Sequence, residues 1–242
     1  MRAQDPGDRF AAVARELADL PAGDVLDRVA ELAVEVIDGC DHAGVSLVHR
    51  GKITTVAATD EVVVTGDKQQ YAFNEGPCLQ SLGEHETVSS PQLSTDDRWP
   101  RWARWATEHL GIGSILCFQL FTSEHSYGTL NLYSDRVIAF DGHDEAVGLA
   151  LAAHTAVAIA ARQSIEGLSS AVRSRTVIGQ AEGILMERYQ LSAAQAFAVL
   201  VRVSRDENRK LIRIAEELVD TRKTPGTPNS SASTPTVDPR TG

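Results

Sequence analysis

The sequence predicts an α+β domain, built on an antiparallel sheet flanked by helices, followed by a long coiled-coil-like helix and an all-α three-helix bundle. Three observations carry this prediction. Residues 44–140 mix short β-rich runs with helical segments, residues 143–188 keep one helical pattern, and two more helix starts follow Tyr189. Short strands joined by hairpins favour an antiparallel sheet. A helix far longer than about 12 residues needs a second surface to pack against.

Two helices are predicted at the start of the chain. Apolar residues recur at helical spacing through residues 8–37, and a turn containing Pro21 divides them into two runs, with Asp24 placed to cap the second. Two β-rich stretches come next, residues 45–48 and 53–56, and they flank a polar turn. This arrangement predicts a hairpin.

The rest of the sheet follows in short pieces. Strands are predicted over residues 86–89, 114–121 and 127–133. A helix over Arg101–Leu110 separates the first two of these strands and ends at Gly111. We therefore expect the α+β domain to end near Phe140.

One helical pattern then runs from about His143 to Arg188. Its apolar and small residues repeat with alternating spacings of three and four, which is the pattern of a coiled coil. The seam consists of Leu151, His154, Ala158, Ala161, Ile165, Leu168, Val172, Arg175 and Gly179. Pairing of two such helices predicts a homodimer, and a bent helix packed on the α+β domain is the alternative.

Two further helices complete the bundle. Ser192 and Gln195 have the spacing of a capping box, in which a hydroxyl and an amide three residues later bond each other's backbone. Asp206 is placed to cap the last helix, which has one apolar face. Together with the end of the long helix, these segments predict a small three-helix bundle.

The net charge differs between the predicted α+β part of the chain and the predicted three-helix bundle. The 242 residues hold 23 Lys/Arg and 33 Asp/Glu, a formal net charge of −10, which argues against a protein that coats nucleic acid or an anionic membrane along its whole length. Residues 1–167 hold 12 basic and 25 acidic residues, whereas residues 168–223 hold 10 and 7. Residues 223–242 are rich in Pro, Ser, Thr and Gly and are predicted to be disordered.

Motifs for catalysis and metal binding are missing from the sequence. It has no phosphate loop, no HExxH zinc pattern and no GxSxG nucleophile, so no enzyme, metal site or cofactor is expected. Cys40, Cys78 and Cys117 form no CxxC pair, which favours a reducing cytoplasm. Neither a signal peptide nor a membrane span is predicted.

Two features are candidates for a pocket or signal site. Cys78 follows a Glu-Gly-Pro sequence and is either a redox-active thiol or a buried structural cysteine. Trp99, Trp102 and Trp105 alternate with arginines. This pattern suits the stacking of nucleic-acid bases, and it equally suits aromatic side chains that close a core or wall a pocket.

Gly183 is unexpected because glycine has a low propensity for the interior of a helix. It lies inside a strongly helical run, where glycine costs about 1 kcal/mol relative to alanine. A close approach to the backbone would explain it. Another helix and a ligand are both possible sources of that approach, and the spacing does not choose between them.

At these residues the sequence resembles two known families. Residues 167–222 resemble the ANTAR RNA-binding domain of transcription antitermination regulators, and the preceding part is similar to the GAF sensor domains that often precede ANTAR in actinobacterial proteins. The ANTAR resemblance rests on Arg175, Ile178, residues 180–186, Ala196, Phe197, Leu200, Ser204, residues 208–211 and Ala215. The GAF resemblance rests on residues 43–47, 57–60, Asp67, Gln70, Tyr71, and residues 75–78, 97–100 and 128–134.

The resemblance implies a domain organisation and a function. A GAF sensor domain over residues 10–162 would follow an N-terminal segment, residues 1–9. An ANTAR domain over residues 163–222 would precede a tail, residues 223–242. ANTAR domains are expected to bind a pair of RNA hairpins with hexanucleotide loops and so prevent formation of a terminator. The expected partners are this RNA, a second copy of the chain, and an unknown small molecule on the GAF domain.

The resemblance also suggests site residues. Ala181 and Gly183 would form the surface that RNA approaches closely, although both could instead pack against the second helix. Base or phosphate contacts are expected from Ser204, Asn208 and Lys210, and backbone contacts from Arg175, Arg202 and Arg209. Local capping by Asn208 and an ordinary solvated surface for the arginines are the alternatives.

The sequence leaves the role of the GAF pocket and two alternative functions open. Cys78, Trp99 and Tyr71 are candidates for a GAF pocket or signal site, which is expected either to bind a small molecule, to respond through Cys78, or to be filled core. Two other functions stay open on the sequence. One is a helical DNA-binding regulator, and the other is a module whose GAF domain makes only protein contacts.

Overall fold

The computed structural model describes residues 24–84, 87–122 and 125–223, and the chain forms two compact units that divide between Ser164 and Ile165. The first predicted helix and the tail predicted to be disordered lie outside these residues, apart from Lys223. The elements of the first unit are α2 (Val25–Val36), β1 (His42–His49), β2 (Lys52–Ala58), α3 (Glu61–Phe73), α4 (Pro77–Glu84), β3 (Val88–Ser90), the 3₁₀ turn η1 (Leu93–Thr95), α5 (Pro100–Leu110), β4 (Ser114–Phe121) and β5 (Ser126–Ser134). Helix α6 (Gly142–Tyr189) follows, and then α7 (Ala193–Asp206) and α8 (Leu211–Thr221).

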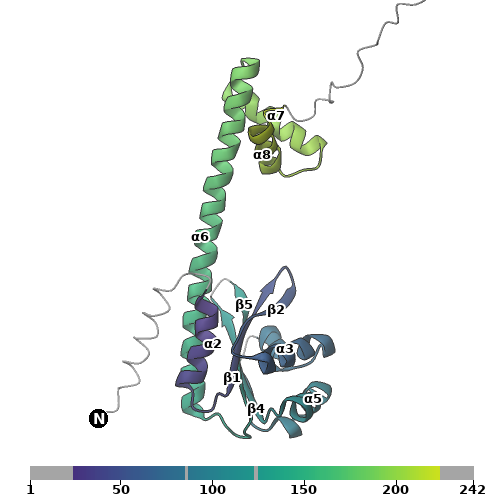
Figure 1. The fold of residues 1–242 in the computed structure, drawn as a ribbon, viewed down its shortest axis with the longest axis vertical. Helices are drawn as coiled ribbons and strands as arrows, with labels where there is room; N and C mark the ends of the chain where they lie inside the picture. Colours follow the sequence, from purple (N-terminus) through teal and green to yellow (C-terminus); the bar gives the residue numbers. More distant parts are fainter. Residues whose placement is uncertain (1–23, 85–86, 123–124, 224–242) are drawn as a thin grey trace, which may run out of the picture. The chain divides into compact units, whose positions relative to one another are not determined.

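The sheet confirms the predicted fold class. Its strand order is β2-β1-β5-β4-β3, and every neighbouring pair is antiparallel. Helix α2 and the first part of α6 cover one face, while α3 and α5 lie over the other (Figure 1). Each face therefore has its own buried core.

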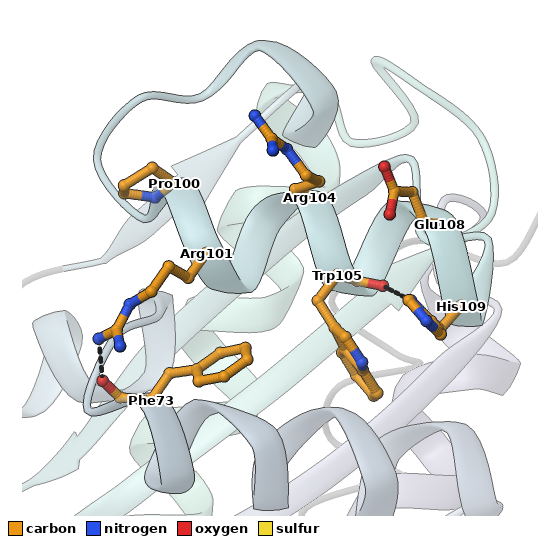
Figure 2. A pocket seen from close by; sticks show the side chains of 7 residues that line it. All are labelled: Phe73, Pro100, Arg101, Arg104, Trp105, Glu108 and His109. Atoms are coloured by element: carbon orange, nitrogen blue, oxygen red, sulfur yellow. Dashed lines mark hydrogen bonds between the residues drawn. The ribbon is translucent and has the colours of Figure 1, made fainter.

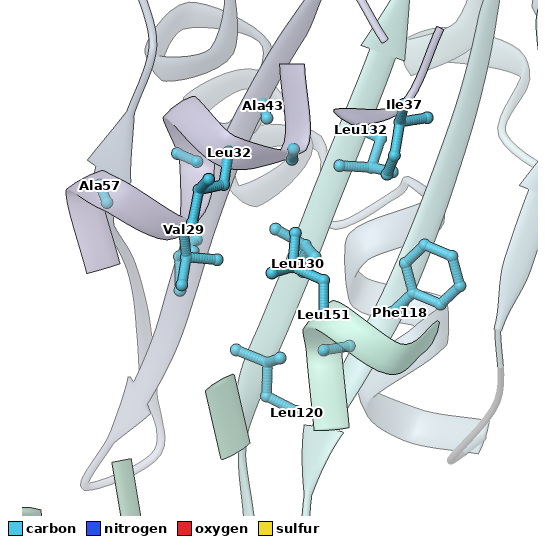
Figure 3. Close-up of a cluster of buried hydrophobic side chains, with 14 of the residues drawn as sticks. Val29, Leu32, Ile37, Ala43, Ala57, Phe118, Leu120, Leu130, Leu132 and Leu151 are labelled. Atoms are coloured by element: carbon cyan, nitrogen blue, oxygen red, sulfur yellow. The ribbon is translucent and has the colours of Figure 1, made fainter. Parts of the chain in front are cut away.

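The core under α2 and α6 is almost entirely aliphatic. Val29 and Leu32 from α2 and Leu151 from α6 meet Leu130 and Leu132 of β5 (Figure 3). The approach of α6 is close, because a Cβ placed on Gly148 would collide with the ring of Phe118 on β4. The sequence therefore needs glycine at this point of the helix.

Helices α3 and α4 were not predicted, and the burial of α3 explains why. The side of α3 that faces the sheet includes Asp67 and Gln70, both fully buried, so the helix lacks the apolar period by which a packed helix is recognised. Its start is nevertheless well marked, since the Asp60 side chain accepts hydrogen bonds from the backbone N–H groups of Val62 and Val63. The helix ends at Asn74, which adopts the left-handed conformation.

Two predicted helix caps are wrong in detail. Asp24 occupies the N-cap position of α2, but its side chain makes no capping hydrogen bond. Asp206 belongs to the last turn of α7, and α8 begins at Leu211 after Lys210, with no side-chain cap. A turn of four residues, 207–210, therefore separates these two helices.

The second unit forms the predicted three-helix bundle. Ser192 and Gln195 make both bonds of the capping box at the start of α7. The bundle core consists of Ala181, Leu185, Ala196, Leu200, Ile214, Ala215 and Leu218. The Arg188 guanidinium donates to the carbonyl of Arg222 at 2.8 Å, so a cation satisfies the C-terminal end of α8.

Helix α6 has 48 residues, about 72 Å at the standard rise per residue. By length and composition it is the one helix, among the residues described, that is apolar enough to cross a membrane. Its 18-residue apolar window has a mean hydropathy of 1.3 and is 44% buried inside the protein. Packing against the sheet accounts for apolar residues such as Leu151 and Ile159 in the first part of this helix.

His42 links the start of β1 to the start of α3 and to the end of β5, through Asp60 and Asp135. We call these three residues the histidine clamp. His42 at the start of β1 contacts the Asp60 carboxylate with Nδ1 at 2.6 Å and Asp135 with Nε2 at 3.3 Å. Burial alone would lower the pKa of His42, but the hydrogen bond and charge of Asp60, followed by those of Asp135, raise it above its usual value. The folded protein therefore holds this proton more tightly than the unfolded chain.

We expect this clamp to make stability fall as the pH rises. The contribution of protonated His42 is fully present below about pH 6.5, the value for unfolded histidine, and is lost as the pH rises through the higher pKa of the folded state. Urea unfolding over a pH series checks this expectation. His42→Gln should remove that part of the pH dependence, whereas His49→Gln, at an exposed histidine at the end of β1, should keep it. An unchanged pH profile in His42→Gln would contradict the assignment.

Candidate functional site

A buried polar cluster lies between α3 and the sheet. At its centre is Asp67, which is 0% exposed. Its carboxylate accepts hydrogen bonds from the hydroxyls of Tyr133, Ser46 (3.1 Å) and Thr55 (2.8 Å) and from the Asn131 amide (3.2 Å). Helix α3 therefore presents one carboxylate to donors from three strands, β1, β2 and β5.

The electrostatics of this cluster are set by its burial. Burial raises the pKa of Asp67, against the hydrogen bonds of Tyr133, Thr55, Ser46 and Asn131, which lower it. The Oδ1 atom of Asn131 is buried and has no hydrogen-bond partner. Buried polar atoms are nearly always paired. Among the residues that the structure describes, this acceptor is the exception in the cluster around Asp67.

Two of the three predicted pocket residues belong to this cluster. The Tyr71 hydroxyl lies 2.8 Å from Ser46 Oγ, and burial, followed by the charge of Asp67, raises the pKa of Tyr71. Cys78 is fully buried, with Sγ 3.0 Å from Thr129 Oγ1. Burial, followed by the charge of Asp67, raises the pKa of Cys78 to about 12, so the thiol stays protonated near neutral pH. This disfavours the reactive-thiol interpretation.

Trp99, the third predicted pocket residue, lies elsewhere. It packs edge-on against Trp102 at 6.4 Å in the core beneath α5, and the Arg98 guanidinium covers its ring at 4.3 Å. Trp102 is also fully buried and donates its indole N–H to the Gly66 carbonyl at 3.0 Å. Base stacking is therefore wrong for these two tryptophans, and only Trp105 keeps exposed surface.

The centre of this cluster was not predicted, although the sequence carries a signal for it. Asp67, Gln70 and Tyr71 have the i, i+3, i+4 spacing of one helix face. Asn131 and Tyr133 alternate along a strand. A polar face on a helix that pairs with a polar face on a strand is a sign of a buried polar site.

On the second unit, the structure separates two residues expected to contact RNA together. Ala181 is 0% exposed in the bundle core, so its predicted role as an approach surface is wrong. Gly183 is exposed, and a Cβ built on it would meet no atom within 4 Å. Packing within the described chain therefore does not explain this glycine. An approach from outside the chain remains as its explanation.

Four predicted residues lie at or beside the turn between α7 and α8: Ser204 in the last turn of α7, and Asn208, Arg209 and Lys210 in the turn itself. Asn208 adopts the left-handed conformation with φ of 50°, and Ser204 Oγ donates to the carbonyl of Arg209. Lys210 and the Asn208 amide are exposed, and within the described part of the chain neither side chain has a hydrogen bond or ion pair. The local capping given as the alternative for Asn208 is not seen as a side-chain hydrogen bond among the described residues, so its amide stays available.

The predicted arginines differ in their availability. Arg209 lies 2.8 Å from Glu207 and 2.7 Å from Glu217, and hydrogen bonds to Glu217 first and Glu207 second raise its pKa. Arg202 has a loose contact of 3.7 Å with Asp206. Arg175 is exposed and has no ion pair within the described residues. Arg209 is therefore already neutralised by its neighbours.

Comparisons with known families match both units. Residues 19–160 match the GAF domain family and residues 166–219 match the ANTAR domain family. The GAF match covers more than half of the chain, so the chain belongs to the GAF domain family, and it carries an ANTAR domain of the RNA-binding antitermination class behind it. Both are regulatory rather than catalytic domains. No curated protein matches the sequence.

Solved structures are similar to the first unit in fold. The GAF domain of an Acinetobacter phosphoenolpyruvate-protein phosphotransferase has a TM-score of 0.55 at 16% identity, covering 67% of this chain and 97% of that one. The corresponding domain from Coxiella burnetii has a TM-score of 0.54 at 16% identity, with 69% and 99% covered. A free methionine-R-sulfoxide reductase from Neisseria meningitidis has a TM-score of 0.51 at 18% identity, with 68% and 96% covered. At these identities the likeness shows the fold alone.

Proposed function

We propose that this protein is a transcription antitermination regulator. Its ANTAR domain would bind two RNA hairpins with hexanucleotide loops in a nascent transcript, so that the terminator does not form and polymerase reads through. The observation that carries the proposal is the open position of Gly183, in the domain that matches the ANTAR family, where a Cβ built on the glycine would meet no atom within 4 Å. A regulator of nascent transcripts would act where they are made, which we propose is the cytoplasm.

The proposed RNA contacts follow from exposure and pairing. Gly183 would allow the RNA to approach the α6 backbone, and the unpaired groups of Asn208, Lys210 and Arg175 would donate to bases and phosphates. Unstacked loop bases expose their edges to such donors, unlike bases inside an A-form duplex. Arg209 would need to leave Glu207 and Glu217 first, so we expect it to contribute less.

Two copies of the chain would present two RNA-binding bundles. From Ala161 to Arg173 every residue of α6 is exposed in the single chain. Ile165, Leu168 and Val172 occupy successive seam positions and are 67%, 69% and 59% exposed. Pairing of this stripe with the same stripe of a second copy would bury it and match a target with two hairpins.

The cluster around Asp67 is proposed as the site where the GAF domain senses its signal. The Asn131 Oδ1 atom is an acceptor without a partner, so the chemistry favours a small ligand that donates a hydrogen bond. Tyr71 and Cys78 would line this site. Such a ligand would alter RNA binding only to the extent that it binds two states of the protein with different affinity.

Gel-shift titration of the full chain with three nucleic acids tests the proposed function. A tandem hexaloop RNA is expected to bind most tightly, a single hairpin more weakly, and duplex DNA least. Preference for duplex DNA would instead support the DNA-binding alternative. Absence of binding to all three, with and without extracts that supply small ligands, would overturn the proposal and favour a protein-contact module.

Gly183→Leu is expected to weaken binding of the tandem RNA by at least about tenfold, because a branched side chain would occupy the approach surface and remove more than about 1.4 kcal/mol of contact energy. The fold should survive, since the position is open and leucine is a good helix former. Gly167→Leu is the matched control at another open glycine of α6. Equal RNA affinity in the wild type and the folded Gly183→Leu variant would exclude close approach at this helix.

A further inference from the structure

A groove with a volume of about 430 Å³ lies on the outer side of α5, beside the end of α3 (Figure 2). It is lined by Phe73 from α3 and by Pro100, Arg101, Arg104, Trp105, Glu108 and His109 from α5. Phe73 and Trp105 give it aromatic walls, and Arg104 and Glu108 are the charged groups along α5. The groove is separate from the polar cluster around Asp67, with which it shares no residue.

The aromatic walls are held in place by their neighbours. Arg101 donates from Nε to Glu75 at 2.5 Å and from its guanidinium to the Phe73 carbonyl at 2.6 Å. The same guanidinium lies 5.2 Å from the centre of the Phe73 ring. Trp105 stacks on His109 with ring centres 5.2 Å apart and planes 13° apart. A flat apolar surface is therefore preformed, which lowers the entropic cost of binding a ring.

The charges of the groove are one cation and one anion. Arg101 is already paired with Glu75, so it adds little net charge. Arg104 and Glu108 are exposed, and neither has a hydrogen bond or ion pair with any residue in the described ranges. They are four residues apart, about 6 Å along the axis of α5, and in Figure 2 both side chains extend to the side of the helix away from Phe73 and Trp105. Because neither is held by a partner, both can turn toward the rings.

From these features we propose that the groove binds a free aromatic α-amino acid. The ring would lie against Phe73 and Trp105. Arg104 and Glu108 would turn toward it from the positions seen in Figure 2, so that Arg104 meets the carboxylate and Glu108 the ammonium. A ligand with only a negative charge would be repelled by Glu108, and one with only a positive charge by Arg104. The acidic excess of residues 1–167 also disfavours a polyanion such as RNA on this surface.

Titration of the full chain with L-phenylalanine tests the proposal, with selectively excited tryptophan fluorescence and calorimetry as readouts. Trp99 and Trp102 are buried, so a fluorescence change reports mainly on Trp105. We expect saturable binding of L-phenylalanine, and at least about fivefold weaker binding of phenylacetate, phenethylamine and L-alanine, because each lacks one of the three contacts. Tighter binding of adenosine monophosphate than of L-phenylalanine would overturn the amino-acid assignment, and so would no saturation at all.

Two substitutions assign the charges separately. Arg104→Gln should weaken L-phenylalanine binding and remove the preference over phenethylamine, whereas Glu108→Gln should remove the preference over phenylacetate. Lys68→Gln and Glu145→Gln make the same charge changes at other exposed positions and should alter neither preference. If the two groove variants keep both preferences, the proposed contacts are wrong. All four positions are exposed, so loss of the fold is not expected to confuse the result.

Discussion

Replacing Ile165, Leu168 and Val172 together by serine is expected to convert the proposed homodimer to a monomer and to weaken binding of the two-hairpin RNA by about 100-fold, the range expected when linkage of two binding modules is lost. All three side chains are more than half exposed in the single chain. Burial of each in a helix pair would contribute about 1.5–3 kcal/mol per side chain, which serine removes. None belongs to the bundle core, so the ANTAR domain should stay folded.

Analytical ultracentrifugation and RNA titration read out this result together. Affinity for a single hairpin should stay unchanged, because each bundle is intact. Gln163→Ala with Ser170→Ala is the control, since these exposed residues lie on the opposite side of the heptad and should leave both mass and affinity unchanged. The pairing proposal would be contradicted if the triple-serine variant remained a dimer. It would also be contradicted if the variant were a monomer and still bound the two-hairpin RNA with full affinity.

Asp67→Ala is expected to lower the free energy of unfolding of the GAF domain by about 3 kcal/mol or more. The change leaves the Tyr133 hydroxyl, the Ser46 hydroxyl and the Asn131 amide buried without their acceptor, and each unsatisfied group costs about 1–3 kcal/mol. Asp67→Asn should cost less, because one amide oxygen continues to accept. Urea unfolding followed by circular dichroism measures both variants.

The pH dependence of Asp67 has a definite sign. Burial raises its pKa, so the folded state binds a proton more tightly than the unfolded chain. The contribution of this carboxyl to the free energy of unfolding therefore falls as the pH rises above about 4, the value for unfolded aspartate. Asp67→Asn should lose this dependence, whereas Asp97→Ala, at an exposed aspartate, should keep both it and full stability. Equal stability of Asp67→Ala and Asp97→Ala would show that the cluster contributes nothing to the fold.

Much of the fold was predictable because its strands and long helix follow simple periods. Strand β4 coincides with the predicted residues 114–121, and the capping box at Ser192 fixed the start of α7. Helices α3 and α4 were missed. A buried face with Asp67 and Gln70 does not follow apolar periodicity, because its energy comes from hydrogen bonds across to Asn131 and Tyr133 of the sheet. Such partners are distant in sequence and become visible only after folding.

The candidate sites were predictable in type and only partly in residues. Spacing identified Gly183 as unusual, and its open surroundings support an approach from outside the chain. The same spacing could not tell that Ala181, two residues earlier, faces the opposite side and fills the core. Exposure of Trp105, in contrast to Trp99 and Trp102, likewise depends on which turn of α5 meets the sheet.

Single-round transcription in vitro tests the central claim most directly. The template would carry two hexaloop hairpins ahead of an intrinsic terminator, and a control template would carry the same stems with altered loops. With increasing amounts of the full chain, the fraction of read-through transcript is expected to rise on the first template and stay constant on the second. Constant termination on the first template, under conditions where gel shifts show its RNA bound, would contradict antitermination as the function of this protein.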